Sequence, residues 1–341
     1  MRTPFFILFI LLFGAFACSK IEDSETIQEI PFSMEIPEGF PAVEYPEDNE
    51  YSYARWELGK HLFFEKSLSR DQSISCASCH LPSYAFSDTT RVSLGVENSP
   101  GLRNSPSLAN VAYQPYFTRE GGVNTLEKQV LVPVQEHVEF DFNLLEITER
   151  LREDEFYVSL SEEAYQRELD PFVITRAIAT FERSLLSGNS SYDAFFFQNK
   201  NQALSPQQKA GLELFNSDKT NCFQCHSDFN FSNYAFENNG LYEEYEDQGR
   251  FRLTNDEADL ALFKTPSLRN VAITAPYMHD GSLKNLQEVV AHYNSGGKNH
   301  PHKNQLIIPL NLSEQEQENL IAFLQSLTDE SFINNKHFQQ P

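Results

Sequence analysis

The 341-residue sequence is short of positive charge. It has 26 Lys and Arg against 49 Asp and Glu, which gives a net charge of −23. A surface of this sign repels phosphate backbones, so nucleic acid is excluded as a partner. The acidity favours partners that carry a basic patch, and it also serves solubility; the composition leaves both roles open.

Long hydrophobic runs are missing after the first residues. The chain starts Met1-Arg2 and has one apolar run, Phe5–Ala17, which is too short for a membrane span but typical of a secretion signal. Residues 17–20 (Ala-Cys-Ser-Lys) look like a lipoprotein cleavage site, although Ala15 replaces the usual Leu. Either Cys18 is acylated and becomes the mature N-terminus, or ordinary cleavage occurs nearby. In both cases we expect a periplasmic protein, soluble or tethered by lipid.

Cysteine is also scarce, and its spacing is informative. One of the five is Cys18, and the others form Cys76-Ala-Ser-Cys79-His80 and Cys222-Phe-Gln-Cys225-His226. Exported proteins often form disulfides. Cys-x-x-Cys-His, however, is the pattern of c-type haem attachment, in which the thiols form thioethers and the His ligates iron. The alternative, a zinc site or a redox dithiol, leaves the adjacent His residues unexplained.

The chain divides into four segments. They are a signal peptide at 1–17, an acidic tether at 18–48, an N-terminal haem domain at 49–200 and a C-terminal haem domain at 201–335. Helical spacing is present over Tyr53–Leu62 and 143–187, and Ser205 and Ser313 are typical helix N-caps. Strand-like runs are few. We therefore predict a mainly α fold of two cytochrome-c-like domains.

An internal repeat relates the two domains. Leu58–Phe63 precedes the first haem unit, and the similar Gly211–Phe215 precedes the second. Two further stretches match at an offset of 160 residues: Pro106–Ala112 with Pro266–Ala272, and Gly121–Val130 with Gly281–Val290. A repeat of this length indicates two joined copies of one haem-binding unit.

The same offset predicts that the two haems differ. Helical spacing from Leu286 leads to Tyr293, whose phenol oxygen can ligate iron, whereas the position 160 residues earlier is Pro133, which has no ligand atom. A haem with two protein ligands transfers electrons, and one with an open sixth position binds peroxide or oxygen. We expect the His80 haem to be open and the His226 haem to be closed.

Four motifs point to a known family. They are Leu58-Gly-Lys-His-Leu-Phe-Phe64, Ser73-Ile-Ser-Cys-Ala-Ser-Cys-His80, Arg103-Asn-Ser-Pro-Ser-Leu108 and Ala275-Pro-Tyr-Met-His-Asp-Gly281. From about Tyr53 to Leu327 the chain resembles the bacterial di-haem cytochrome c peroxidases and their relative MauG. The resemblance implies two α domains with a calcium ion between them. It also implies an N-terminal haem that reacts with hydrogen peroxide, a C-terminal haem that receives electrons from a small cytochrome or cupredoxin, and often a homodimer.

The resemblance assigns roles to individual residues. The family's catalytic Glu falls on Glu139, its neighbouring distal Gln on Gln129 and its distal Pro on Pro133. A carboxylate beside an open haem can take a proton from peroxide and return it to the leaving oxygen; otherwise Glu139 is one of many surface acids. The implied calcium ligands are the Asn104 side chain and the backbone carbonyls of Thr274 and Pro276. Asn104 is otherwise a turn residue.

Three positions depart from the peroxidase pattern. Val96 replaces the distal His that many peroxidases carry at rest, so the first site should be open without reductive activation. Tyr293 replaces an axial Met, and MauG also uses Tyr there. The rival ligands near it are Met278, His279 and His292. Arg119 replaces the Trp between the haems, and the only Trp is Trp56, so the inter-haem electron route is left open.

Three functions follow from these positions. The first, which we expect, is a cytochrome-c peroxidase that reduces hydrogen peroxide with electrons from a small redox protein; an open first site with Glu139 favours it. The second is a MauG-like oxidase of a protein or organic substrate, favoured by Tyr293 and the missing distal His. The third is a non-catalytic electron-transfer protein, which requires two six-coordinate haems.

Overall fold

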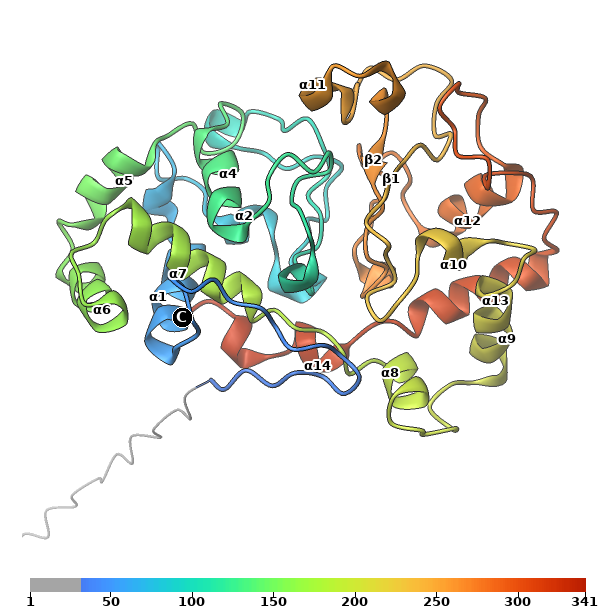
Figure 1. Ribbon diagram of the computed structural model, residues 1–341, viewed down its shortest axis with the longest axis horizontal. Coiled ribbons are helices and arrows are strands. Elements are labelled where there is room, and N and C mark those ends of the chain that lie inside the picture. Colours follow the sequence, from blue (N-terminus) through green and yellow to red (C-terminus); the bar gives the residue numbers. More distant parts are fainter. Residues whose placement is uncertain (1–31) are drawn as a thin grey trace, which may run out of the picture. The chain divides into compact units, whose positions relative to one another are not determined.

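The computed structural model describes residues 32–341, so the expected signal peptide, Cys18 and the first part of the tether lie outside the described residues. Over 32–341 no helix is long and apolar enough to cross a membrane. The prediction of a mainly α fold is confirmed (Figure 1). The one sheet of the described chain pairs β1 (Phe236–Glu237) antiparallel to β2 (Phe263–Lys264).

The helices fall into two series along the chain. The first series is α1 (Tyr53–Phe64), α2 (Cys76–Cys79), α3 (Leu126–Gln129), α4 (Leu131–Gln135), α5 (Leu144–Leu151), α6 (Glu155–Tyr165) and α7 (Pro171–Arg183). The second is α8 (Ser191–Phe196), α9 (Pro206–Phe215), α10 (Cys222–Cys225), α11 (Phe251–Thr254), α12 (Leu286–Ser295), α13 (Glu314–Gln325) and α14 (Glu330–Ile333). Short 3₁₀ turns connect several of them.

Each half is built on one close helix pair, and a glycine lies at each crossing. In the pair α1–α7, a Cβ added to Gly59 would lie 1.9 Å from the carbonyl oxygen of Ala177. In the pair α9–α13, a Cβ added to Gly211 would lie 1.9 Å from the carbonyl oxygen of Asn319. Any side chain would force the helices apart. This requirement explains why the repeated motifs before the two haem units share a glycine.

Local sequence signals set most helix ends. Ser205 and Ser313 cap α9 and α13 as predicted, each in a capping box, and Pro206 occupies the first turn of α9. The predicted helical region 143–187 forms α5, α6 and α7 in turn. Short polar side chains at Asn143, Asp154 and Asp170 cap these three helices.

The two copies of the repeat start their helices alike and then differ. Thr125 caps α3 and Asn285 caps α12 at equivalent positions. α12 continues unbroken to Ser295, whereas the first copy breaks at Val130 between α3 and α4. Pro133 lies just beyond the break and has no N–H to continue the helical ladder. The copy that carries Tyr293 is therefore one continuous helix, and the other is interrupted.

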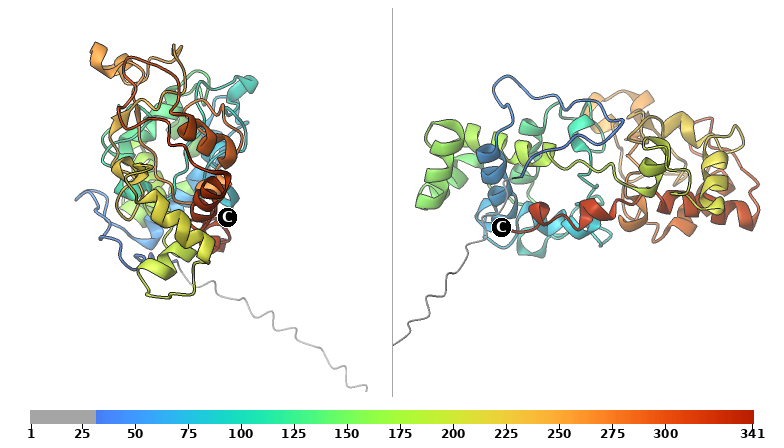
Figure 2. Two further views of the ribbon diagram at one scale, coloured as in Figure 1. Left: turned by 90° about the vertical axis from the view of Figure 1, so that its right-hand side faces the viewer. Right: turned by 90° about the horizontal axis from the view of Figure 1, so that it is seen from below.

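The C-terminal segment returns to the first half. Phe332 of α14 and Phe338 share a buried cluster with Trp56, Phe86 and Phe181. Figures 1 and 2 show the C-terminus beside α1. The segment after α13 thus completes the core of the N-terminal half, although its position in the sequence suggested the second domain.

The described part of the expected tether also packs on the body. Residues 32–52 have no helix or strand, yet the Phe32 ring stacks on Trp56 at 4.6 Å, and Phe40 packs on Phe229 at 4.7 Å. Asp48 forms an ion pair with Arg176. Residues 32–48 therefore differ from a free tether, because their aromatic rings pack on residues that are distant in the sequence.

Candidate functional site

The two Cys-x-x-Cys-His units form matching single-turn helices. In α2 the His80 N–H donates to the Cys76 carbonyl at 3.0 Å, and in α10 the His226 N–H donates to the Cys222 carbonyl at 2.9 Å. The four thiols form no disulfide. Within each unit, both thiols and the imidazole are thus held on one short turn, as covalent attachment to one porphyrin requires.

A second feature common to both units fixes the imidazoles. His80 Nδ1 lies 2.8 Å from the Phe86 carbonyl oxygen, and His226 Nδ1 lies 3.0 Å from the Phe231 carbonyl oxygen. A carbonyl can only accept, so Nδ1 carries the hydrogen and Nε2 keeps its lone pair. Burial lowers the pKa of both imidazoles, which favours the neutral form that ligates a metal. Both residues therefore fit proximal haem ligands.

The surroundings of the units fit haem better than zinc. Among residues 32–341 no group of three or more His, Cys, Asp or Glu could hold a metal ion, whereas a c-type haem needs only the two thiols and one His per unit. Gln129 Oε1, on the expected distal side, is buried without a hydrogen-bond partner from the protein. A buried polar atom left without a partner indicates a missing ligand or water.

The Glu139 carboxyl group lies close to the first unit and has a raised pKa. Burial, and then the charge of Glu136, raises the pKa of Glu139 to about 7. Burial is the main cause of the raised pKa of the Cys76 and Cys79 thiols, and the charge of Glu139 contributes to both. Glu139 is therefore near the first attachment site and can both accept and donate a proton at neutral pH.

Two backbone contacts hold Glu139 in this position. The Val96 N–H donates to the Glu139 carbonyl at 2.9 Å. A Cβ added to Gly95 would lie 2.1 Å from the Val138 carbonyl oxygen, so only glycine allows this approach. Val96, which replaces the distal His, thus contributes its backbone while its side chain is buried in the protein.

Tyr293 lies near the second unit. Its ring packs against the C-terminal core, and burial raises its pKa to about 12. A hydrogen bond with the Asn239 side chain lowers this pKa, and the nearby Cys222 and Cys225 raise it. Asn239 Nδ2 also donates to Met278 Sδ at 3.2 Å. Two of the predicted alternatives for the axial ligand therefore meet at one asparagine, which no sequence signal had indicated.

The two rival histidines have other contacts. The His292 Nε2 atom bonds to the Asn239 carbonyl oxygen at 3.0 Å. The His279 ring stacks on Phe263 with centroids 4.1 Å apart. These contacts favour Tyr293 or Met278 over either histidine as the ligand.

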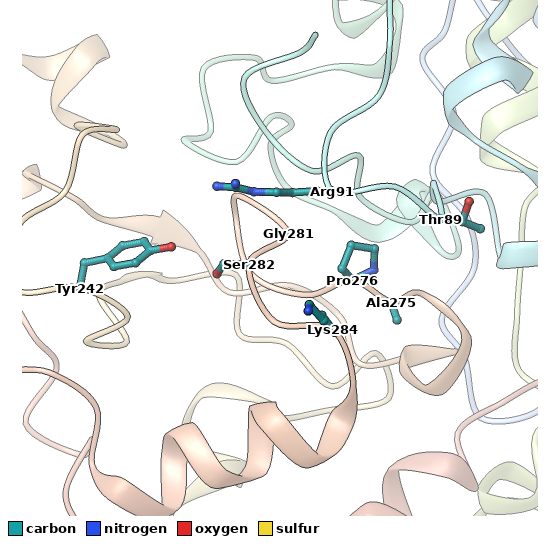
Figure 3. Close-up of a pocket in the computed structure, with 8 residues that line it drawn as sticks. All are labelled: Thr89, Arg91, Tyr242, Ala275, Pro276, Gly281, Ser282 and Lys284. Carbon is teal, nitrogen blue, oxygen red and sulfur yellow. The ribbon is translucent and has the colours of Figure 1, made fainter.

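The one side-chain ligand of the implied calcium site does not fit the ion. Thr274 and Pro276 lie on the loop of the second half, and Pro276 lines a pocket of about 580 Å³ that Arg91 and Lys284 also line (Figure 3). The Asn104 side chain is buried, with 5% exposed, and its Oδ1 atom accepts a hydrogen bond from the Arg119 guanidinium at 3.1 Å. The oxygen that calcium would use is thus already bound to a cation.

Two family models match the chain. The family described as di-haem cytochrome c peroxidase matches residues 53–202, and the family described as cytochrome c matches residues 208–328. The methylamine utilization protein MauG of Methylorubrum extorquens is 34% identical over 320 residues, covering 93% of this chain and 89% of that protein.

Two further relatives are similar over most of the chain. The cytochrome-c peroxidase IdrP1 of Pseudomonas sp. strain SCT is 35% identical, with 84% of each chain covered. The crystal structure of a MauG-like protein associated with microbial copper homeostasis superposes with a TM-score of 0.85 at 33% identity, covering 91% of this chain and 99% of that one. The relatives thus include both MauG proteins and peroxidases.

Proposed function

Because the chain belongs to the di-haem cytochrome c peroxidase family that includes MauG, we propose that it reduces hydrogen peroxide to water. The reaction takes place at the His80 site, and a small cytochrome or cupredoxin supplies two electrons through the His226 site. The family implies two c-type haems, which supply the iron that binds peroxide and stores oxidising equivalents when present. The export signal leads us to propose a periplasmic location.

The observation that carries this proposal is Glu139. Its pKa of about 7 lets one carboxyl group take a proton from one peroxide oxygen and give it to the other, which leaves as water. Gln129 has a buried amide oxygen without a protein partner, so it can accept a hydrogen bond from peroxide and orient it. Two electrons and two further protons complete the conversion of one peroxide into two waters.

Steady-state peroxide reduction tests the proposal. The purified di-haem protein is mixed with a reduced small cytochrome and hydrogen peroxide, and oxidation of the donor is followed. We expect Glu139→Gln to lower kcat/KM for peroxide by roughly 10²- to 10⁴-fold. The exposed Glu136, three residues away, provides the matched control, and Glu136→Gln should keep most of the activity. Equal activity of wild type and Glu139→Gln would contradict the proposal.

Tyr293 supports a second candidate, a MauG-like oxidase of a protein or organic substrate. A tyrosinate ligand lowers the potential of a haem and favours higher oxidation states, which suits substrate oxidation better than simple electron relay. Rapid steady turnover with peroxide and a reduced cytochrome supports the peroxidase. Negligible turnover with that donor, together with peroxide-driven oxidation of a co-exported protein, supports the oxidase. A protein that does not react with peroxide at all is the electron-transfer alternative.

The lipid anchor at Cys18 and the homodimer stay predictions.

A further inference from the structure

The Arg119 side chain binds Asn104, and the backbone of both residues contacts the second half. The Arg119 side chain makes three hydrogen bonds, all to Asn104: Nη2 donates to the backbone oxygen at 2.7 Å and to Oδ1 at 3.1 Å, and Nε donates to the backbone oxygen at 3.3 Å. These acceptors are neutral oxygens of the kind that bind a hard cation. One of them, Asn104 Oδ1, is the side-chain oxygen that the implied calcium site would use.

The orientation of the Asn104 amide is fixed by its other contacts. Nδ2 faces the carbonyl oxygens of Thr90 at 3.3 Å and Arg91 at 3.5 Å, which can only accept. Oδ1 must therefore face Arg119. A calcium ion on Oδ1 would displace the guanidinium or lie against it, and two positive charges at that distance repel strongly in a partly buried site.

Two backbone hydrogen bonds connect Arg119 and Asn104 to the second half. The Asn104 N–H donates to the His279 carbonyl at 2.9 Å, and the Lys264 N–H donates to the Arg119 carbonyl at 2.7 Å. Asn104 and Lys264 are 160 residues apart, as are Arg119 and His279, so the two bonds are equivalent under the repeat. The Arg119 side chain links these two bonds, because it binds Asn104 within the first half.

The local charges also leave no requirement for a divalent ion. Arg103 is paired with Glu120 and Asp247, and the Asp280 carboxylate accepts from the Tyr242 hydroxyl at 2.7 Å. The Lys264 Nζ also points into this region and donates to the Tyr116 carbonyl at 2.8 Å. The acidic groups near the junction thus already have cationic or hydroxyl partners.

We propose that the Arg119 guanidinium takes the place of the calcium ion between the two halves, so that the protein folds and holds its haem sites without calcium. The junction is then stabilised by a cation that belongs to the chain. Chelators cannot remove it, and its positive charge stays in place at any calcium concentration. This inference concerns the junction and does not depend on which substrate the protein oxidises.

Calcium content and thermal stability of the holoprotein test the proposal. After dialysis against EGTA or against millimolar calcium chloride, the wild type should hold well below one calcium per chain by elemental analysis. Its Tm and visible haem spectrum should be the same in both buffers. One tightly held calcium per chain, or a Tm that falls in EGTA, would overturn the proposal without need of any variant.

Two variants of Arg119 sharpen the test. Arg119→Ala frees both Asn104 oxygens, so we expect its Tm to fall by about 4 °C and to recover on addition of calcium, with uptake of one ion per chain. Arg119→Lys keeps a cation and should stay indifferent to calcium. A folded Arg119→Ala protein that neither binds calcium nor responds to it would refute the idea that the guanidinium occupies a calcium position. If this variant does not fold, the wild-type measurements decide.

Discussion

The pH dependence of the peroxide reaction tests the role of Glu139 most directly. Burial and the neighbouring Glu136 raise the pKa of this carboxyl group to about 7. To accept a proton from peroxide the group must be ionised, so the rate should rise with pH and level off above the pKa. At pH 5, about 1% of the groups are ionised, because each pH unit below the pKa lowers the ionised fraction about tenfold.

The assay is single-turnover mixing of the oxidised protein with peroxide, which needs no electron donor. We expect the second-order rate constant to be about 50-fold lower at pH 5 than at pH 7 and to change little above pH 8. Glu136→Gln removes one cause of the raised pKa, so its midpoint should move to lower pH while the plateau stays the same. A rate constant that is flat from pH 5 to 8, or an unchanged midpoint in Glu139→Gln, would refute the reasoning.

Three further predictions concern the second site and the folded state. Tyr293→Phe should change the electron paramagnetic resonance spectrum of one haem and leave the other as it was; an unchanged spectrum would transfer the ligand role to Met278. Gly59→Ala should lower the free energy of unfolding by about 1–3 kcal/mol in denaturant titrations, because its Cβ would lie 1.9 Å from the Ala177 carbonyl oxygen. Burial raises the pKa of Glu182 to about 8, so its contribution to stability is full below about pH 4.5 and is lost as pH rises through 8. Glu182→Gln should therefore be more stable than wild type at pH 8, by on the order of 3 kcal/mol, and this advantage should vanish near pH 4.

Local signals and the repeat explain how much of the fold could be predicted. Ser205 and Ser313 cap helices because their side chains bond to backbone atoms only three residues away, so the pattern is complete within a few residues. The return of Phe332 and Phe338 to the first core could not be predicted in this way. An aromatic residue shows that it needs burial, but not which distant surface buries it.

In the candidate site too, short motifs could be predicted, and contacts between distant residues could not. The two haem units are short motifs, and the chemistry of thiols and imidazole at that spacing identifies them. The role of Gly95 depends on a carbonyl 43 residues away in the chain, and the role of Asn239 depends on Met278 and Tyr293. The calcium expectation came from the resemblance to the family, which carries over the residue type at Asn104 but not the Arg119 guanidinium that lies against its side chain. Side-chain identity gives the capacity to bind, and the neighbours determine what is bound.

The asymmetry between the two halves arises at side chains while the backbone contacts stay equivalent. The bonds from Asn104 to His279 and from Lys264 to Arg119 are the same bond in the two copies. Because backbone groups make these bonds, the side chains at the same positions are free to differ without disturbing the junction. One copy thereby has an asparagine and an arginine, which bind each other, where the other has a lysine and a stacked histidine. A duplicated haem unit can come to have two unlike halves in this way, because the shared backbone bonds hold both copies in register while single side chains differ.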